Sequence, residues 1–217
     1  MRARRAREIG KRRNTLLSVA RDMPSSGLRG AIDLLAVGFL LFMAFSAVGW
    51  AYETVNDMIC RQGFYPRAAL MGPWCPIYGI GGLLISCLSW VVRPGRRGLA
   101  KVGEVVVAAV AIALLVTFVE LAGSYACEAM MGYMPWDYSP YWGNFEGRIA
   151  PEFTLRFVIG GLVFLYWLEP TIVRAYRSHR DAGVIAALVL LVLFVADNVL
   201  EVAGVWAGFP VRAGIPF

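Results

Sequence analysis

The stretch GPWCPIYGIGG, residues 72–82, decides how the rest of the chain can fold. Pro73 and Pro76 lack a backbone N–H and restrict the residues before them, so a regular helix can begin only near Pro76. The stretch lies inside the longest uncharged run of the chain, residues 68–92. Irregular backbone of this kind is tolerated at membrane depth only where other protein or a wet cavity satisfies its amide groups. We therefore expect the rest of the chain to pack around it.

The composition is that of a membrane protein. Of the 217 residues, 59% are hydrophobic and 17% are charged, whereas soluble domains carry roughly a quarter charged residues. The chain also has more long apolar segments than a soluble core of this size can bury. The sequence therefore predicts an all-α polytopic membrane protein, a bundle of about five transmembrane helices with an irregular Pro/Gly-rich entry to the second.

The apolar segments set the predicted domain organisation. A basic tail, residues 1–30, precedes a single transmembrane domain, residues 31–217, without internal repeats. The fourth segment has the weakest pattern, because only twelve uncharged residues separate Arg156 from Glu169; it spans if both charges reach the membrane surface. The predicted helices lie near 32–53, 76–92, 104–127, 153–173 and 184–206.

Basic residues alternate between the connecting segments. Sixteen Lys and Arg side chains fall on one side of the predicted bundle and four on the other, and nine of the sixteen lie in the tail. By the positive-inside rule, the N-terminus is cytoplasmic and the C-terminus extracytoplasmic in the plasma or inner membrane. The tail has no interleaved aromatic residues, so we expect it to contact anionic lipid of the bilayer rather than nucleic acid.

Acidic side chains lie inside the apolar segments, where each costs roughly 2.5–3.5 kcal/mol on insertion scales. Glu53, Glu120, Asp197 and Glu201 all fall toward the extracytoplasmic third, at the level where residues 72–78 enter. Three stripes of small and polar residues at helical spacing carry these acids, and such stripes let membrane helices approach closely. The stripes are Ser46, Gly49, Glu53 and Asn56; Ala113, Thr117, Glu120, Ser124 and Cys127; and Asp197, Glu201, Gly204 and Gly208.

The loop after the third predicted helix is rich in aromatic residues. These rings form either an interfacial aromatic belt or a lid whose ring faces and carboxylates receive a cation or an amine. Arg148 and Arg156 could instead neutralise the acids in a structural ion-pair network. The candidate binding residues are Glu53, Tyr78, Glu120, Glu128, Trp136, Asp137, Tyr138 and Asn144.

No catalytic, metal or cofactor site follows from the sequence. Its four cysteines show no metal-ligand spacing, and His179 is the single histidine, so we expect no zinc site. Cys60 and Cys75 fall in one predicted outer loop, and whether they form a disulfide is left open.

Several of these residues are shared with a known family. Gly49-Trp50-x-x-Glu53, Gly72-Pro73-x-Cys75-Pro76-Ile77-Tyr78-Gly79, Glu120, Glu128, Trp136-Asp137-Tyr138-Ser139, Asn144 and Gly147 stand in this chain. The pattern resembles the putative ABC-transporter type IV family, the CmpB-like multipass membrane proteins, over roughly residues 45–175. The resemblance implies a membrane component of a transporter. The chain has no Gly-x-x-x-x-Gly-Lys-Ser/Thr phosphate loop, so ATP use would need a separate ATPase subunit.

Three functions fit the sequence. The leading one is a permease-like transport or ligand-binding component with an acidic, aromatic-lined pocket near the extracytoplasmic face, for a small-molecule or cationic ligand, in which Glu120 changes charge. The second is a non-catalytic accessory or scaffold protein that binds another membrane protein. The third is a membrane-embedded enzyme that acts on a lipid-linked substrate with paired carboxylates. We expect no enzymatic activity, because no Ser/His or Cys/His pair lies in the predicted membrane segments.

Overall fold

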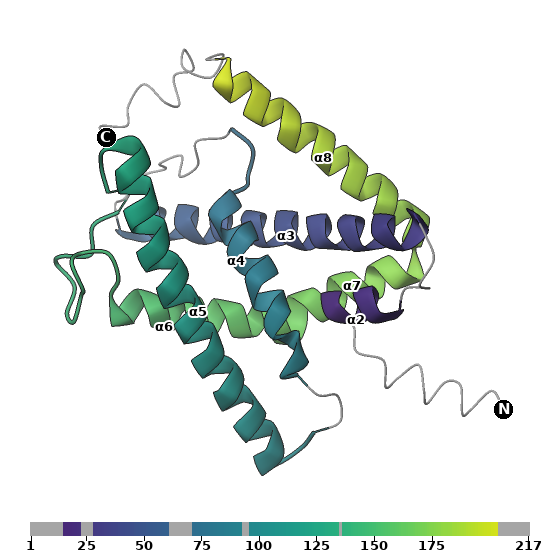
Figure 1. Ribbon diagram of the computed structural model, residues 1–217, viewed down its shortest axis with the longest axis horizontal. Helices are drawn as coiled ribbons and strands as arrows, with labels where there is room; N and C mark the ends of the chain where they lie inside the picture. The colour runs from purple at the N-terminus through teal and green to yellow at the C-terminus, as the bar shows by residue number, and fades with distance from the viewer. Residues whose placement is uncertain (1–14, 23–27, 61–70, 93–95, 135, 204–217) are drawn as a thin grey trace. The chain divides into compact units, whose positions relative to one another are not determined.

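The computed structural model describes residues 15–22, 28–60, 71–92, 96–134 and 136–203. The described part is helical, with one isolated β-bridge between Phe145 and Ile149, so the all-α prediction is confirmed. In chain order the elements are α2 (Leu16–Asp22), α3 (Leu28–Cys60), α4 (Pro76–Ser86), the short 3₁₀ helix η1 (Cys87–Trp90), α5 (Leu99–Met131), α6 (Pro151–Val163), the π-helical turn η2 (Phe164–Leu168), α7 (Glu169–Ser178) and α8 (Arg180–Val202) (Figure 1).

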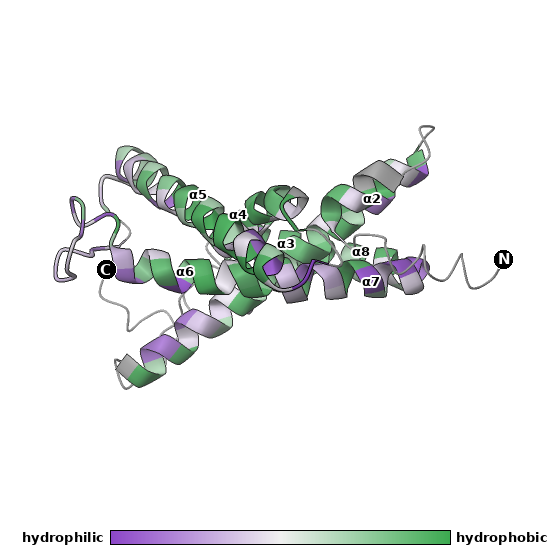
Figure 2. Ribbon diagram, turned by 90° about the horizontal axis from the view of Figure 1, so that it is seen from below, coloured by the Kyte–Doolittle hydropathy of each residue, from purple (hydrophilic) through white to green (hydrophobic). Residues whose placement is uncertain are grey.

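Four helices in the described residues are long and apolar enough to cross a membrane. They cover Leu28–Ile59, Leu99–Met130, Pro151–Ser178 and Arg180–Glu201, and the green colour of most of α5 in Figure 2 shows how hydrophobic such a helix is. Even the 22-residue helix reaches about 33 Å at 1.5 Å per residue, which exceeds the ~30 Å hydrocarbon core. The third of them contains the weak fourth segment of the sequence. It continues through η2, and its Arg156 pairs with Glu152 one turn earlier.

The second predicted span is shorter than the sequence suggested. Its apolar helix covers Pro76–Ser89, because the prolines fix its start and the chain tightens into η1 before the basic loop. Residues 71–75 approach it without regular structure. The irregular entry that the sequence predicts is therefore present, followed by a helix shorter than the other four.

The chain divides into two compact units, each described by itself. The first unit holds residues 1–21 and 84–171, and the second holds residues 22–83 and 172–217. In the first unit α5 packs along α6. Ile112 of α5 and Phe164 and Leu165 of η2 are almost fully buried, and these large side chains form the core of the unit.

In the second unit α3 packs along α8. The rings of Phe39 and Phe42 on α3 lie edge-on to Phe194 of α8 at 6.2 and 5.5 Å between centroids. At the other end of these helices, Asp33 accepts hydrogen bonds from the Tyr176 hydroxyl at 2.6 Å and from Arg180 Nε at 2.7 Å. Aromatic packing and this polar contact together hold α3 against the last part of the chain.

Some predictions fall on parts that the structure does not describe. Residues 1–14 and 23–27 of the basic tail, the side chain of Cys60, and Gly204 and Gly208 lie outside the described residues. Cys75 is a free thiol. The division into a tail and one membrane domain stays a prediction.

Candidate functional site

Glu120 lies in α5 and faces the loop between α5 and α6. Its Oε1 accepts a hydrogen bond of 3.3 Å from the Tyr138 hydroxyl. Its Oε2 is buried and has no hydrogen-bond partner among the described residues. One turn earlier, the Thr117 hydroxyl lies 3.4 Å from that of Thr154 on α6, so the two helices touch directly below the carboxylate. Glu120 therefore offers one open oxygen inside the protein.

Aromatic rings surround the hydroxyl that contacts Glu120. The Tyr138 ring stacks on Phe153 of α6 with 4.0 Å between centroids and 10° between planes. Tyr141 meets Phe153 edge-on at 4.7 Å and Tyr138 at 6.2 Å. Trp142 and Phe145, in contrast, are 88% and 51% exposed. The aromatic residues here thus form two sets, one packed around Tyr138 and one exposed, and the exposed set suits the belt interpretation.

Short-range hydrogen bonds give the loop its shape. Asp137 Oδ1 accepts from the Ser139 N–H at 2.8 Å, and hydrogen bonds from the Ser139 hydroxyl and N–H lower the pKa of Asp137. The Asn144 side chain donates to the carbonyls of Ser139 and Tyr141 and accepts from the Gly147 N–H. These bonds place Asp137 and Asn144 in the loop framework, where they support Tyr138.

Gly147 is required by this arrangement. Its φ is +67°, and a Cβ there would lie 2.7 Å from Ser139 Oγ and 2.8 Å from Asp137 Oδ1. Only glycine takes this backbone conformation without strain and leaves room for both side chains.

Arg148 neutralises Glu128 at the end of α5. The guanidinium bonds to the Glu128 carboxylate and donates to the Ser124 hydroxyl at 2.8 Å, and it lies 4.0 Å from the Tyr125 ring centroid. The hydrogen bond to Glu128 raises the pKa of Arg148. Trp136 Nε1 donates to the Arg148 carbonyl at 2.8 Å. Among the predicted residues, Glu128 thus belongs to an ion pair, the structural alternative that the sequence left open, and Trp136 bonds to the backbone of its arginine.

A groove of about 540 Å³ runs between α5 and α6. Its walls are mostly apolar, and Thr117 and Thr154 are its main polar side chains. None of the eight predicted binding residues lines it. The remaining lining residues are Ala109, Val110, Ala113, Gly143, Ile149, Ala150, Pro151, Leu155 and Val158.

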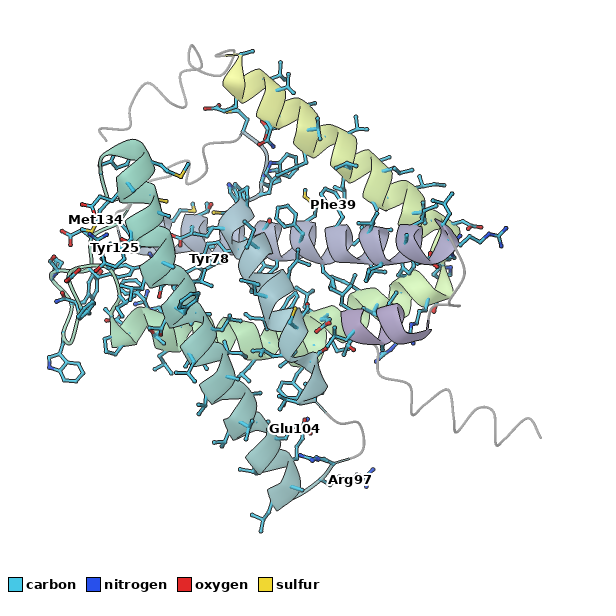
Figure 3. All side chains as sticks on the ribbon, viewed as in Figure 1. Phe39, Tyr78, Arg97, Glu104, Tyr125 and Met134 are labelled. Atoms are coloured by element: carbon cyan, nitrogen blue, oxygen red, sulfur yellow. The ribbon has the colours of Figure 1, made fainter. Side chains whose placement is uncertain are left out.

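Glu53 and Tyr78 meet in the second unit, where the predicted stripe of α3 faces the start of α4. The Tyr78 hydroxyl donates to Glu53 Oε1, and the Cys75 N–H donates to the Ser46 carbonyl at 3.0 Å. Gly49 lies directly beneath Tyr78, and a Cβ there would overlap the ring. The spacing of Ser46, Gly49 and Glu53 therefore identified a real contact face (Tyr78 is labelled in Figure 3).

Asp197 of α8 holds the irregular stretch that leads into α4. Its carboxylate accepts from the N–H groups of Met71 and Gly72 at 3.2 and 2.9 Å and from Trp74 Nε1 at 3.0 Å. The sequence places Asp197 among the membrane acids, but no sequence pattern indicates this role. Asp197 and its three partners are more than 120 positions apart in the chain. Asp197 thus satisfies the amide groups of Met71 and Gly72, while the carbonyls of Gly72 and Ser46 accept those of Trp74 and Cys75.

The predicted site residues therefore fall into two groups. Glu53 and Tyr78 meet in the second unit; the other six, from Glu120 to Asn144, lie in the first, where Glu120 contacts Tyr138. The single pocket that the sequence analysis expected stays a prediction. Among the described residues no group of three His, Cys, Asp or Glu side chains could hold a metal ion.

The comparison with known families agrees with the pattern of residues and helices. The family described as Putative ABC-transporter type IV matches residues 40–202, which is more than half of the chain. No curated protein and no solved structure matches it. The match includes both groups of predicted residues and all four long apolar helices in whole or in part. The chain is thus a multi-pass membrane protein and belongs to the Putative ABC-transporter type IV family.

Proposed function

We propose that this protein is a transport component that takes up a cationic, amine-bearing solute at Glu120. The observation that carries the proposal is the buried Oε2 of Glu120, which has no partner among the described residues. A carboxylate at membrane depth costs roughly 2.5–3.5 kcal/mol, and Tyr138 supplies a single hydrogen bond of 3.3 Å. A cationic ligand would offset this cost by charge pairing.

The surroundings of Glu120 suit an organic cation. Tyr138, Phe153 and Tyr141 form an aromatic cluster, and the Tyr138 hydroxyl of this cluster donates to the Glu120 carboxylate. Ring faces attract ammonium groups by about 0.5–2 kcal/mol, depending on desolvation. Glu128 makes a useful contrast, because Arg148 already neutralises it. The proposal therefore assigns ligand charge recognition to Glu120 and a structural role to Glu128.

We further propose an orientation and an energy source. The excess of basic residues in three of the connecting segments favours a cytoplasmic N-terminus and an extracytoplasmic loop 132–150. ATP use would come from a separate ATPase subunit, because the sequence contains no phosphate-binding loop. A membrane-impermeant thiol reagent tests the orientation: it should label Trp142→Cys in intact cells, in a background without native cysteines. Labelling only after the cells are broken would contradict it.

The binding proposal is tested by thermal stability of the purified protein in nanodiscs. Tetramethylammonium and a primary diamine are the probes, each added to a buffer that already contains saturating Na⁺, and an equal addition of NaCl is the reference for ionic strength. Either probe should raise the apparent Tm of the wild type in a saturable way, because ligands that bind only the folded state stabilise it. Glu120→Gln should keep the fold and lose the shift.

The matched control is Glu128→Gln, which removes a carboxylate of the same helix. It should lower the basal Tm, since it breaks the pair with Arg148, yet keep the probe-dependent shift. An absent shift in the wild type, or an equal shift in Glu120→Gln, would reject the proposal. Stable purification only as a complex with another membrane protein, with no shift by either probe, would favour the scaffold function instead.

A further inference from the structure

We propose that Glu169, Ser86 and Ser89 form a binding site for a small monovalent cation in the first unit. Glu169 begins α7, Ser86 ends α4, and Ser89 lies in η1. The site does not depend on the function proposed for Glu120, which lies near the opposite end of the α5–α6 pair. It concerns an inorganic ion rather than an organic solute.

The three side chains are buried and present unused oxygen atoms. Glu169 and Ser86 are 0% exposed and Ser89 is 1% exposed. Glu169 Oε2, Ser86 Oγ and Ser89 Oγ make no hydrogen bond of ordinary length and angle among the described residues, although the Ser86 hydroxyl interacts with the Glu169 carboxylate. Buried polar atoms are nearly always partnered in folded proteins, so three such oxygens in one region call for a ligand.

The local backbone brings these oxygens together. The Ser86 hydroxyl faces the Glu169 carboxylate. Ser89 is three residues further along a 3₁₀ helix, in which side chains at i and i+3 eclipse one another, so both serines lie on the same face. Glu169 directly follows the π-helical turn η2, and its N–H donates to the Phe164 carbonyl five residues earlier. Turns of this kind recur at functional sites.

The other oxygen of the Glu169 carboxylate, Oε1, already accepts a hydrogen bond. Glu169 Oε1 accepts the Leu16 N–H at 2.8 Å, which ties the start of α2 to α7. Thr15 and Ser18 hydrogen-bond to each other at this point and are both buried. Oε2 is therefore the oxygen that remains for a ligand, whereas residues 15–18 cover Oε1.

Charge decides the class of ligand. No ion pair to Glu169 occurs within the described part of the chain, whereas the nearby acid of α5, Glu104, is paired with Lys101 at 2.5 Å and accepts from Tyr166 (Glu104 is labelled in Figure 3). An all-oxygen set of a carboxylate and two hydroxyls suits a hard cation. One carboxylate balances one positive charge, and a divalent ion would leave a net buried charge. A monovalent ion such as Na⁺ fits best.

The test is direct binding of radioactive Na⁺ to the full-length protein in nanodiscs, with choline as the inert cation. The wild type should bind about one Na⁺ per chain in a saturable way, and unlabelled Na⁺ should displace it. Glu169→Gln should abolish binding. Because that variant also loses a buried acceptor of the Leu16 N–H, Ser86→Ala/Ser89→Ala serves as the second variant and should weaken binding at least about tenfold.

Two controls separate this site from others. Glu152→Gln removes an exposed carboxylate of α6 and should bind Na⁺ like the wild type. Asp181→Asn, at an exposed carboxylate of α8, should also bind Na⁺ normally. The assay measures Na⁺ alone, so failure of the organic-cation proposal does not affect this one. No saturable Na⁺ binding by the wild type, as expected if water alone fills the site, would overturn the proposal. Equal binding by the double serine variant would overturn it as well.

Discussion

Two acids of the second unit, Asp197 and Asp33, and two of the first, Glu120 and Glu169, differ in how their oxygens are used. In the second unit Asp197 accepts three hydrogen bonds and Asp33 two. In the first unit Glu120 and Glu169 each keep one buried oxygen without a partner among the described residues. Acids of the first kind hold backbone and helices in place, whereas for those of the second kind we propose a bound cation. Membrane depth alone therefore does not identify a functional carboxylate.

Among the substitutions that test this difference, we expect the largest loss of stability at Asp197. Asp197→Asn should lower the free energy of unfolding by about 3 kcal/mol, because it removes the charge and places an amide opposite three N–H donors. The measurement is thermal or denaturant unfolding in nanodiscs. Asp181→Asn, at a side chain that is 94% exposed on the same helix, should change stability by less than about 0.5 kcal/mol. Equal effects of the two substitutions would contradict the holding role.

The contact between α3 and α4 gives the next effect. Gly49→Ala should destabilise the protein by roughly 2 kcal/mol, because the added Cβ overlaps the Tyr78 ring. Gly38→Ala on the same helix has open space around it and should be neutral or stabilising by up to about 1 kcal/mol. Unfolding of both variants in parallel checks this. A neutral Gly49→Ala would show that the two helices do not approach as described.

A smaller effect is expected at the pair within that contact. Tyr78→Phe and Glu53→Gln should each cost about 1 kcal/mol, since each breaks or weakens the hydrogen bond between hydroxyl and carboxylate. A double-mutant cycle should give a coupling energy of about 1 kcal/mol. Additive effects would mean that the two side chains do not interact. In that case Glu53, like Glu120, would have a carboxylate oxygen available to a ligand.

The smallest effect concerns Asp137. The hydrogen bonds from Ser139 lower its pKa in the folded loop, so its contribution to stability is fully present above the unfolded pKa. This contribution is lost as pH falls through the lowered pKa. Asp137→Asn should therefore reduce the stability difference between neutral and acidic pH, measured by Tm against pH. An unchanged pH profile would show that the carboxylate does not support the loop.

Local sequence patterns predicted the parts of the fold that depend on neighbouring residues. Hydrophobic run lengths gave the long helices, and prolines gave the irregular approach to α4. Helical spacing correctly grouped Ser46, Gly49 and Glu53 on the face that contacts α4. The length of α4 was overestimated, because an uncharged run does not reveal where a helix tightens into a 3₁₀ turn.

Long-range partners could not be read from the sequence. The irregular Pro/Gly stretch implied that its backbone amide groups need partners from another part of the chain. No sequence pattern identified Asp197 as the acceptor. The same holds for Glu169, which looked like a charge at a helix end until the π-helical turn placed it opposite Ser86. The sequence suggested Arg148 as one possible partner for the acids. Only the structure shows that Arg148 pairs with Glu128 and that Glu120 Oε2 has no partner among the described residues.

We propose that this protein binds and moves a cation through the open oxygen of Glu120. Charge displacement on a solid-supported membrane measures this directly, with proteoliposomes exposed to a jump in tetramethylammonium concentration. We predict a saturable transient current for the wild type and for Glu128→Gln, and none for Glu120→Gln. No current in the wild type, or an undiminished current in Glu120→Gln, would contradict the claim.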